Sequence, residues 1–296
     1  MTRTALQMAA TIRTPDMIRH QLEQGAALAI SISGGKDSQA LLQALVREHK
    51  AQGWTGRVFA IHADLGRMEW TQTPDVVVAQ AEAADVELVV VQRAKGDLLA
   101  RIRDRRAQLE GTGRPFWPSS AARYCTSDLK RDPIDKYLRT LEHVVVAMGL
   151  RADESSARAK KLPCQIRSRI TTQARQAHDW NPILHWNEAD VWDELGTSLK
   201  SLNHRREIAK HGPVSELLAL AGWTSHPAYV FGNERLSCAL CILASRSDLV
   251  NGARHNPTIF AELLDMERSS GCTFQAKLSL ESIAAELDST GHVPPC

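Results

Sequence analysis

A glycine pair followed by lysine stands near the start of the chain, in the hexapeptide Ser-Gly-Gly-Lys-Asp-Ser. The hexapeptide follows the apolar run Ala26–Ile32 and precedes the helix-like segment Gln39–Lys50. Glycines let the backbone turn tightly and approach an anion, and the start of a helix presents unpaired N–H groups and a positive dipole end. A lysine adds a full positive charge, and the serine hydroxyls can donate hydrogen bonds. The pattern favours a phosphate site over an ordinary strand-to-helix turn, formed by Ser33, Gly34, Gly35, Lys36, Asp37 and Ser38.

A carboxylate follows the next apolar run along the chain. The segment His62–Gly66 places Asp64 two residues before Gly66, and Glu69 comes soon after. A carboxylate beside a phosphate site suits magnesium, because hard divalent cations take oxygen ligands. An aspartate in this position also caps turns. The segment therefore leaves two roles open for Asp64, a magnesium or nucleotide contact and a turn cap.

Cations gather after the fourth apolar run, where Gly149 precedes Arg151, Glu154 and Arg158. Arginine presents a planar fork that matches phosphate or sulfate oxygens, and Lys130 upstream can add a point charge. Each of these cations, considered alone, is more often a solvated surface residue than a ligand-binding one. Glu154 has three candidate roles: ordering the arginines, binding a metal, or standing exposed at a helix start. The clustering favours an anion site.

Four apolar runs of strand length alternate with helix-like segments, which predicts an α/β fold with a parallel sheet and helices on both faces. Thr73-Pro74 is typical of a helix start. Ligands of such folds bind at the carboxyl ends of the strands, where the motifs above lie. The predicted strands are Ala26–Ile32, Val58–Ala63, Val86–Val91 and His143–Met148.

Two domains are expected from the change in pattern near residue 198. Residues 1–197 form the predicted nucleotide-binding α/β domain, and residues 198–296 form a smaller, mainly helical region that carries Cys238-x-x-Cys241. Within the first domain, residues 151–175 contain seven Lys or Arg and two acids. We interpret that stretch as an irregular, mobile substrate loop.

The overall charge gives no global electrostatic case for a nucleic-acid or membrane partner, so any such surface must be local. The 296 residues hold 36 basic and 34 acidic side chains, a formal net charge of +2. No apolar stretch approaches the roughly 18 residues of a membrane span, and the N-terminus lacks a secretory segment, so we expect a cytoplasmic protein. The six cysteines are too few and too scattered for a disulfide framework.

The hexapeptide resembles the PP-loop of the ATP pyrophosphatases, which cleave ATP between its α and β phosphates and transfer AMP to an acceptor. Later segments resemble, in order, the phosphoadenosine phosphosulfate (PAPS) reductase branch of that superfamily, from about residue 26 to 245. The resemblance implies a Rossmann-like (HUP-type) fold. The segments are Asp64–Gly66, Arg123–Cys125 with Lys130 and Pro133, Gly149–Arg158, Asn181–Trp186 with Asp190–Trp192, and Tyr229–Cys241.

Two departures separate this chain from the reductases of that branch. Those enzymes usually lack a lysine in the phosphate loop, where this chain has Lys36. They also use a cysteine in a C-terminal Glu-Cys-Gly-Leu-His segment, whereas this sequence ends in Pro-Pro-Cys296. Cys296 is a weak nucleophile candidate, since no activating base is evident. Both departures favour an ATP pyrophosphatase, in which Lys36, Asp37, Arg151 and Arg158 are the expected catalytic residues.

A metal centre is expected from the cysteines. Cys238 and Cys241 can chelate one ion, and the resemblance places Cys125 beside them. Cys164 is the preferred fourth ligand and Cys272 the less favoured one. A 4Fe–4S cluster is the first expectation, with zinc or no metal as alternatives. The related cluster-bearing reductases carry a Cys-Cys pair where this chain has Cys125-Thr126, which leaves the cluster type open.

Three functions are compatible with these motifs. The first is an ATP pyrophosphatase that uses Mg-ATP to adenylate an acceptor for sulfur transfer, similar to the DNA phosphorothioation and tRNA thiolation enzymes. The second is a reductase of adenylyl sulfate or PAPS, and the third is an inactive nucleotide-binding subunit of a modification complex. The expected partners are an adenine nucleotide, a nucleic-acid acceptor contacted by residues 151–175, a sulfur donor protein and a second copy of the chain.

Overall fold

The computed structural model describes residues 11–289, which divide into two compact units. The first comprises residues 11–62, 75–89 and 135–207. The second comprises residues 63–74, 90–134 and 208–289. Cys296 lies outside the described residues, so its predicted role as a weak nucleophile candidate stays a prediction.

A six-stranded sheet forms the centre of the first unit, in the order β3-β2-β1-β4-β6-β5. Strand β1 runs parallel to β2 and β4, β4 runs parallel to β6, and the short β5 runs antiparallel to β6. The four predicted strands are confirmed to within one residue at each end. The strands are β1 (Ala27–Ser31), β2 (Val58–Asp64), β3 (Glu87–Gln92), β4 (His143–Ala147), β5 (Cys164–Ile166) and β6 (Gln176–Trp180).

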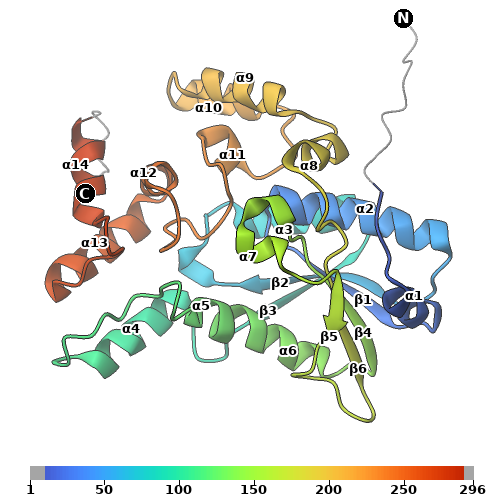
Figure 1. Ribbon diagram of the computed structural model, residues 1–296. Coiled ribbons are helices and arrows are strands. Elements are labelled where there is room, and N and C mark those ends of the chain that lie inside the picture. The colour runs from blue at the N-terminus through green and yellow to red at the C-terminus, as the bar shows by residue number, and fades with distance from the viewer. Residues whose placement is uncertain (1–10, 290–296) are drawn as a thin grey trace, which may run out of the picture. The chain divides into compact units, whose positions relative to one another are not determined.

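Successive side chains of the central strands point to opposite faces of the sheet, and both faces are covered. Leu28 and Ile30 of β1 belong to one apolar cluster with residues from α1, α2, α3 and α8. On the opposite face, Phe59 of β2 meets Tyr137 of α6, with ring centroids 5.8 Å apart. Figure 1 shows α2 along one face of the sheet and α6 along the other. This arrangement confirms the predicted α/β fold.

Helices make up most of the remaining chain. Those up to residue 138 are α1 (Asp16–Glu23), α2 (Lys36–Gln52), η1 (Gly66–Met68), α3 (Thr73–Ala83), α4 (Leu98–Leu109), α5 (Tyr124–Thr126), the π-helical turn η2 (Ser127–Arg131) and α6 (Asp132–Leu138). The later ones are η3 (Ala152–Glu154), α7 (Ser156–Ala159), α8 (Glu188–Glu194), α9 (Leu199–Ala209), α10 (Pro213–Leu220), α11 (Pro227–Phe231), α12 (Arg246–His255), α13 (Pro257–Ser270) and α14 (Leu280–Ser289).

The second unit has its own apolar core. Leu65, Leu98 and Phe116 are buried together with Leu249 of α12 and Leu263 of α13. Segments 63–74 and 90–134 therefore belong with the C-terminal helices, because their apolar side chains are buried against them. This division differs from the predicted boundary between residues 197 and 198, which assigned both segments to the first domain.

Residues 151–175 are more ordered than the mobile loop that the sequence indicated. They contain η3, α7 and β5. Arg167 pairs with Asp135 at 2.7 Å and with Asp179 at 2.5 Å, and Arg169 pairs with Asp135 at 2.9 Å. Arg175 donates to the backbone carbonyls of residues 139, 141 and 170. Three of the seven cations are thus used to hold this segment on the sheet.

Across residues 11–289, every helix is too short or too polar to cross a membrane.

Candidate functional site

The glycine turn after β1 has the conformation that its residues predict. Gly34 has a φ of +77°, which favours glycine, and Gly35 occupies the position before the first residue of α2. The Ser33 N–H donates to Ser38 Oγ at 3.2 Å, and the Ser38 hydroxyl donates to the Gly35 carbonyl at 2.9 Å. Gly35, the residue before α2, has no side chain with which to cap this helix. The first N–H groups of an α-helix lie outside its own backbone ladder, and with a glycine turn beside them they suit an anion.

A glutamine outside the hexapeptide braces this turn. Gln80 of α3 is buried, and its Nε2 donates to the Gly34 carbonyl at 3.0 Å. This hydrogen bond fixes the orientation of the peptide unit between Gly34 and Gly35. Sequence inspection missed Gln80, since one glutamine on a helix carries no local signal of such a contact.

Lys36 begins α2 and is 3% exposed. Its Nζ lies 3.6 Å from Asp37 Oδ2 and 3.5 Å from Glu188 Oε1, and 5.9 Å from the centre of the Trp192 ring. Two carboxylates and an aromatic face thus hold the ammonium group next to the glycine turn. Glu188 was not predicted, because it lies about 150 residues further along the chain.

Arg151 joins the loop after β4 to the start of α2. Its side chain is 5% exposed, its Nε donates to Asp37 Oδ1 at 2.5 Å, and its Nη1 donates to both oxygens of Asp153 at 2.8 and 2.6 Å. Gly149 permits this approach, since a Cβ there would lie 3.1 Å from the carbonyl carbon and oxygen of Asp37. The structure therefore brings Gly149 and Arg151 together with the glycine turn, as the sequence predicted.

Glu154 orders the cations around it. Its Oε2 accepts a bond from the Arg151 backbone N–H at 3.3 Å, and its carboxylate forms an ion pair with Arg158. Of the three roles that the sequence left open, this geometry corresponds to ordering the arginines. Arg158 is thereby held within α7, in the same unit as the glycine turn.

Asp64 caps a turn in the second unit. Its Oδ1 accepts the Gly66 N–H at 2.6 Å, and its Oδ2 accepts a bond from the side-chain amide of Gln92. Gly66 has a φ of +65°, and a Cβ there would lie 2.5 Å from Asp97 Cβ. Both carboxylate oxygens of Asp64 are engaged, which corresponds to the turn-cap role. A magnesium contact of Asp64 stays a prediction.

Three of the four predicted ligand cysteines lie in the second unit. Burial, followed by the nearby Cys241 thiol, raises the pKa of Cys238 to about 12; among the smaller contributions, Lys130 lowers it and Cys125 raises it. Cys241 Sγ accepts the Leu243 N–H at 3.4 Å, and the Ala239 N–H between the two cysteines donates to Met68 O at 2.9 Å.

Cys164, the predicted fourth ligand, starts β5 opposite Trp180 and packs against the core of the first unit. Burial raises the pKa of its thiol. Within residues 11–289, no three His, Cys, Asp or Glu side chains are arranged as a metal site. The donor chemistry of Cys125, Cys238 and Cys241 suits iron–sulfur or zinc, and these three cysteines belong to the second unit, whereas Cys164 belongs to the first. The metal centre stays a prediction.

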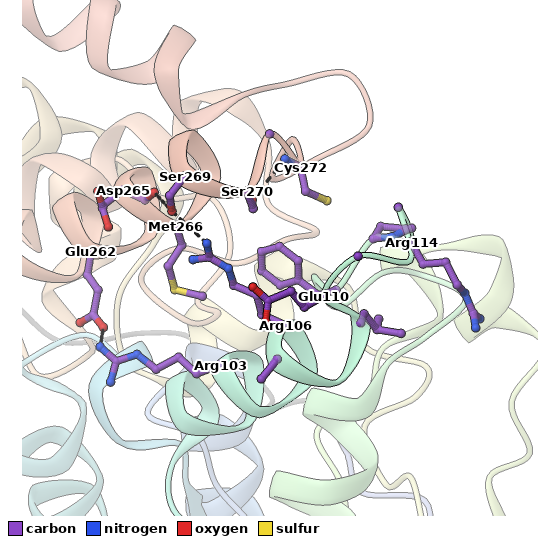
Figure 2. Close-up of a pocket in the computed structure, with 17 residues that line it drawn as sticks. Arg103, Arg106, Glu110, Arg114, Glu262, Asp265, Met266, Ser269, Ser270 and Cys272 are labelled. Atoms are coloured by element: carbon purple, nitrogen blue, oxygen red, sulfur yellow. Dashed lines mark hydrogen bonds and ion pairs between the residues drawn. The ribbon is translucent and has the colours of Figure 1, made fainter.

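A cavity of about 900 Å³ lies in the second unit between α4 and α13 (Figure 2). Arg103 forms an ion pair with Glu262, and Arg106 Nη2 donates to Ser269 Oγ at 3.1 Å. These interactions link the two helices. Of the predicted residues only Cys272 lines this cavity, and its carbonyl accepts a bond from Trp117 Nε1 at 2.8 Å. We assign the cavity no ligand.

Comparison with known proteins gives the family. Residues 27–200 match the family described as the phosphoadenosine phosphosulfate reductase domain. An uncharacterized 37.8 kDa protein of Escherichia phage 186 is 27% identical over 283 residues, covering 81% of this chain and 74% of that protein. An uncharacterized protein of Methanocaldococcus jannaschii is 24% identical over 253 residues, covering 83% of this chain; the chain spans 48% of that relative's length.

Two solved structures also resemble the chain, each at 16% sequence identity. The FMN adenylyltransferase of Candida glabrata has a TM-score of 0.38 and covers 59% of this chain, with 49% of its own length covered. The tRNA thiolase NcsA of Methanococcus maripaludis, solved with its 4Fe–4S cluster, has a TM-score of 0.41 and covers 70% of this chain, with 73% of its own length covered.

Proposed function

Because this chain belongs to the phosphoadenosine phosphosulfate reductase domain family of the PP-loop superfamily, we propose that it is an ATP pyrophosphatase. In this proposal it binds Mg-ATP, cleaves it between the α and β phosphates, and adenylates an acceptor for sulfur transfer. The observation that carries the proposal is the glycine turn at the start of α2, with the buried Lys36 as the first residue of that helix. Amides and an ammonium at one point suit the β and γ phosphates of a nucleotide.

The proposed reaction needs positioning and charge more than side-chain chemistry. An acceptor oxygen attacks the α phosphorus, the bond from that phosphorus to the bridging oxygen breaks, and pyrophosphate leaves with the bonding electrons. The turn amides and Lys36 neutralise the charge that grows on the leaving pyrophosphate. Arg151 and Arg158 are assigned to the α phosphate, and Asp37 positions Arg151 through their 2.5 Å contact. A sulfur nucleophile then displaces AMP from the acceptor.

The proposal includes a 4Fe–4S cluster with Cys125, Cys238 and Cys241 of the second unit as thiolate ligands. Such a cluster would supply an iron that can bind the incoming sulfur. The packing of Cys125 and Cys238 against one apolar core supports this part, and the packing of Cys164 in the first core does not support Cys164 as the fourth ligand. No step above depends on the cluster.

The test measures products and binding together. Purified protein is incubated with Mg-ATP and sulfide, with and without total cellular RNA and DNA, and AMP and pyrophosphate are quantified alongside the Kd for Mg-ATP. We expect AMP and pyrophosphate in equal amounts, and Lys36→Ala to weaken binding at least tenfold and lower turnover about 100-fold. Lys50→Ala, an exposed lysine at the other end of α2, is the control and should match wild type. ADP as the product, or a Lys36→Ala protein equal to wild type, would contradict the proposal.

The second candidate function is reduction of adenylyl sulfate or PAPS, which the name of the matching family favours. Each adenylyl sulfate is supplied with thioredoxin, and sulfite is measured. Sulfite release without ATP cleavage would replace the first proposal with this one. Tight Mg-ATP binding with neither product would favour an inactive nucleotide-binding subunit.

A further inference from the structure

Gln80 lies on the apolar face of α3. Val77 and Ala81 of that face are buried in the apolar core of the first unit. Gln80 is itself 5% exposed, and its Nε2 donates to the Gly34 carbonyl at 3.0 Å. Its Oε1 is buried and has no hydrogen-bond partner among the described residues. An apolar side chain here would avoid an unsatisfied oxygen, so the bond to Gly34 is what the amide contributes at this position.

The Gly34 carbonyl is held from outside the hexapeptide, whereas neighbouring groups of the turn are held from within it. The Ser38 hydroxyl donates to the Gly35 carbonyl at 2.9 Å, and the Ser33 N–H donates to Ser38 Oγ at 3.2 Å. The peptide unit between Gly34 and Gly35 has a glycine on each side, so steric resistance to its rotation is low. The bond from Gln80 is therefore the contact that decides which way this peptide unit points.

The direction of the Gly35 N–H follows from the bond to the Gly34 carbonyl. The peptide bonds of the described residues are trans, so the carbonyl and the N–H of each unit point in opposite directions. Gln80 draws the carbonyl toward α3, and the N–H is consequently directed away from α3. Within residues 11–289, that N–H donates no hydrogen bond. A rotation of this unit by about 180° would replace the N–H by a carbonyl oxygen, whose partial negative charge repels an anion.

We propose that Gln80 is a positioning residue for the phosphate site: by holding the Gly34 carbonyl, it keeps the Gly35 N–H directed at the bound polyphosphate. The inference rests on the proposed function for its class of ligand. Gln80 acts through Gly34 and is assigned no contact with the nucleotide. Because Gln80 comes from α3, the packing of α3 in the first core becomes part of what makes the glycine turn an anion site.

Gln80→Met is the central variant, because methionine has a similar length and no N–H to donate. The probe is inorganic pyrophosphate with Mg²⁺, and its Kd is measured by calorimetry on the purified full chain. We expect the Kd to rise about tenfold, since the Gly35 N–H then has to be reoriented before it can donate to the ligand. Gln52→Met is the matched control and should bind as wild type. Gln52 is exposed at the other end of α2, and its Nε2 donates to Glu48 Oε1 at 2.8 Å.

The NMR signal of the Gly35 amide reports the orientation of the peptide unit, and it is identified by its loss in Gly35→Ala. In wild type with isotopically labelled glycine, pyrophosphate should move the amide proton signal downfield, as a hydrogen bond to an anion does. In Gln80→Glu the carboxylate accepts but cannot donate, so the unit should turn over and the N–H should bond to that carboxylate. The signal should then lie downfield in the free protein and hardly move at pyrophosphate concentrations that saturate wild type. The pyrophosphate Kd of this variant should rise at least about 30-fold.

Three results would overturn the proposal. The first is a Gln80→Met protein that binds pyrophosphate as tightly as wild type. The second is weaker binding in Gln80→Met together with a Gly35 signal that responds equally in Gln80→Glu and wild type, because packing rather than peptide orientation would then be responsible. The third is a wild type that binds no pyrophosphate up to about 10 mM.

The same measurements separate this inference from the proposed function, because pyrophosphate binding and the Gly35 signal do not require turnover. If the variants differ as expected and wild type releases no AMP from Mg-ATP, the proposed function is contradicted and the role of Gln80 is supported. If wild type cleaves Mg-ATP to AMP and Gln80→Met equals it in pyrophosphate affinity, the role of Gln80 alone is contradicted.

Discussion

Replacing Arg151 by alanine tests the buried ion pair that joins the β4 loop to α2. The substitution removes the 2.5 Å bond to Asp37 and the two bonds to Asp153. Asp153 is 41% exposed and regains water, whereas Asp37 is 20% exposed and keeps only Lys36 at 3.6 Å. Removing one partner of a fully buried pair costs about 3–5 kcal/mol. Because Asp37 retains some solvent, we expect Arg151→Ala to lower the free energy of unfolding by about 2–3 kcal/mol.

Urea unfolding followed by circular dichroism measures this loss. With an m value of about 2–3 kcal/mol/M, the midpoint should fall by about 1 M. A double-mutant cycle with Asp37→Asn isolates the pair, and we expect a coupling energy of about 1–2 kcal/mol. Turnover of Mg-ATP to AMP and pyrophosphate should fall about 100-fold in Arg151→Ala under conditions where the protein is folded, because Arg151 is the residue assigned to the α phosphate.

Glu87→Ala provides the matched control in the same unit. Glu87 forms a two-armed pair with Arg57, but both side chains are exposed, at 56% and 40%. Exposed pairs contribute about 0–1 kcal/mol, so the midpoint should move by less than about 0.4 M. If Arg151→Ala unfolds at the same urea concentration as Glu87→Ala, or if the cycle gives a coupling energy near zero, the buried pair does not hold the loop and this reasoning fails.

Three further predictions concern other parts of the chain. Gly149→Val should lower the affinity for Mg-ATP at least tenfold, because the valine side chain would press on the Asp37 carbonyl. The control is Gly196→Ala, where a Cβ meets nothing within 4 Å. This control should lose a comparable amount of stability and leave the affinity for Mg-ATP unchanged. Burial lowers the pKa of His226 to about 4, so the unfolded chain takes up a proton first as the pH falls. The free energy of unfolding should therefore be about 3 kcal/mol lower at pH 4 than at pH 7 because of this residue. His226→Asn should remove this loss. Equal pH dependence of unfolding in wild type and His226→Asn would contradict the prediction. Anaerobically purified protein should contain about four irons per chain, and Cys238→Ser should contain less than one by elemental analysis, whereas an iron-free wild type would exclude the cluster.

Local patterns predicted the glycine turn because all of its determinants are contiguous. A buried strand, two glycines, and a helix start fix the backbone between Ser31 and Gln39 without help from distant residues. The partners of Lys36 could not be found in this way. Glu188 and Trp192 come from α8, and only the packing of that helix in the first core brings them to the ammonium group.

Strands β5 and β6 were missed for a different physical reason. β6 contains His178 and Asp179, which are buried although they are polar, and Asp179 is neutralised by Arg167 at 2.5 Å. Hydropathy detects strands that bury apolar side chains. In β6 a charged side chain, Asp179, is buried instead, because Arg167, the residue after β5, pairs with it. The cations of residues 151–175 suggested a mobile nucleic-acid contact, whereas Arg167, Arg169 and Arg175 hold this hairpin.

Under the proposed function, the charges beside the glycine turn explain how the Lys36 side chain keeps its position before a polyphosphate binds. Lys36 and Arg151 face Asp37 between them, and each has a further carboxylate, Glu188 for the lysine and Asp153 for the arginine. Neither cation therefore needs the turn carbonyls or the solvent as acceptors, and both are held by carboxylates. Under the proposed function, a polyphosphate would meet donors that are already oriented, so little reorganisation would oppose its binding. Asp37, Glu188 and Asp153 lower the net charge of the site, and the same three carboxylates keep its two cations in position.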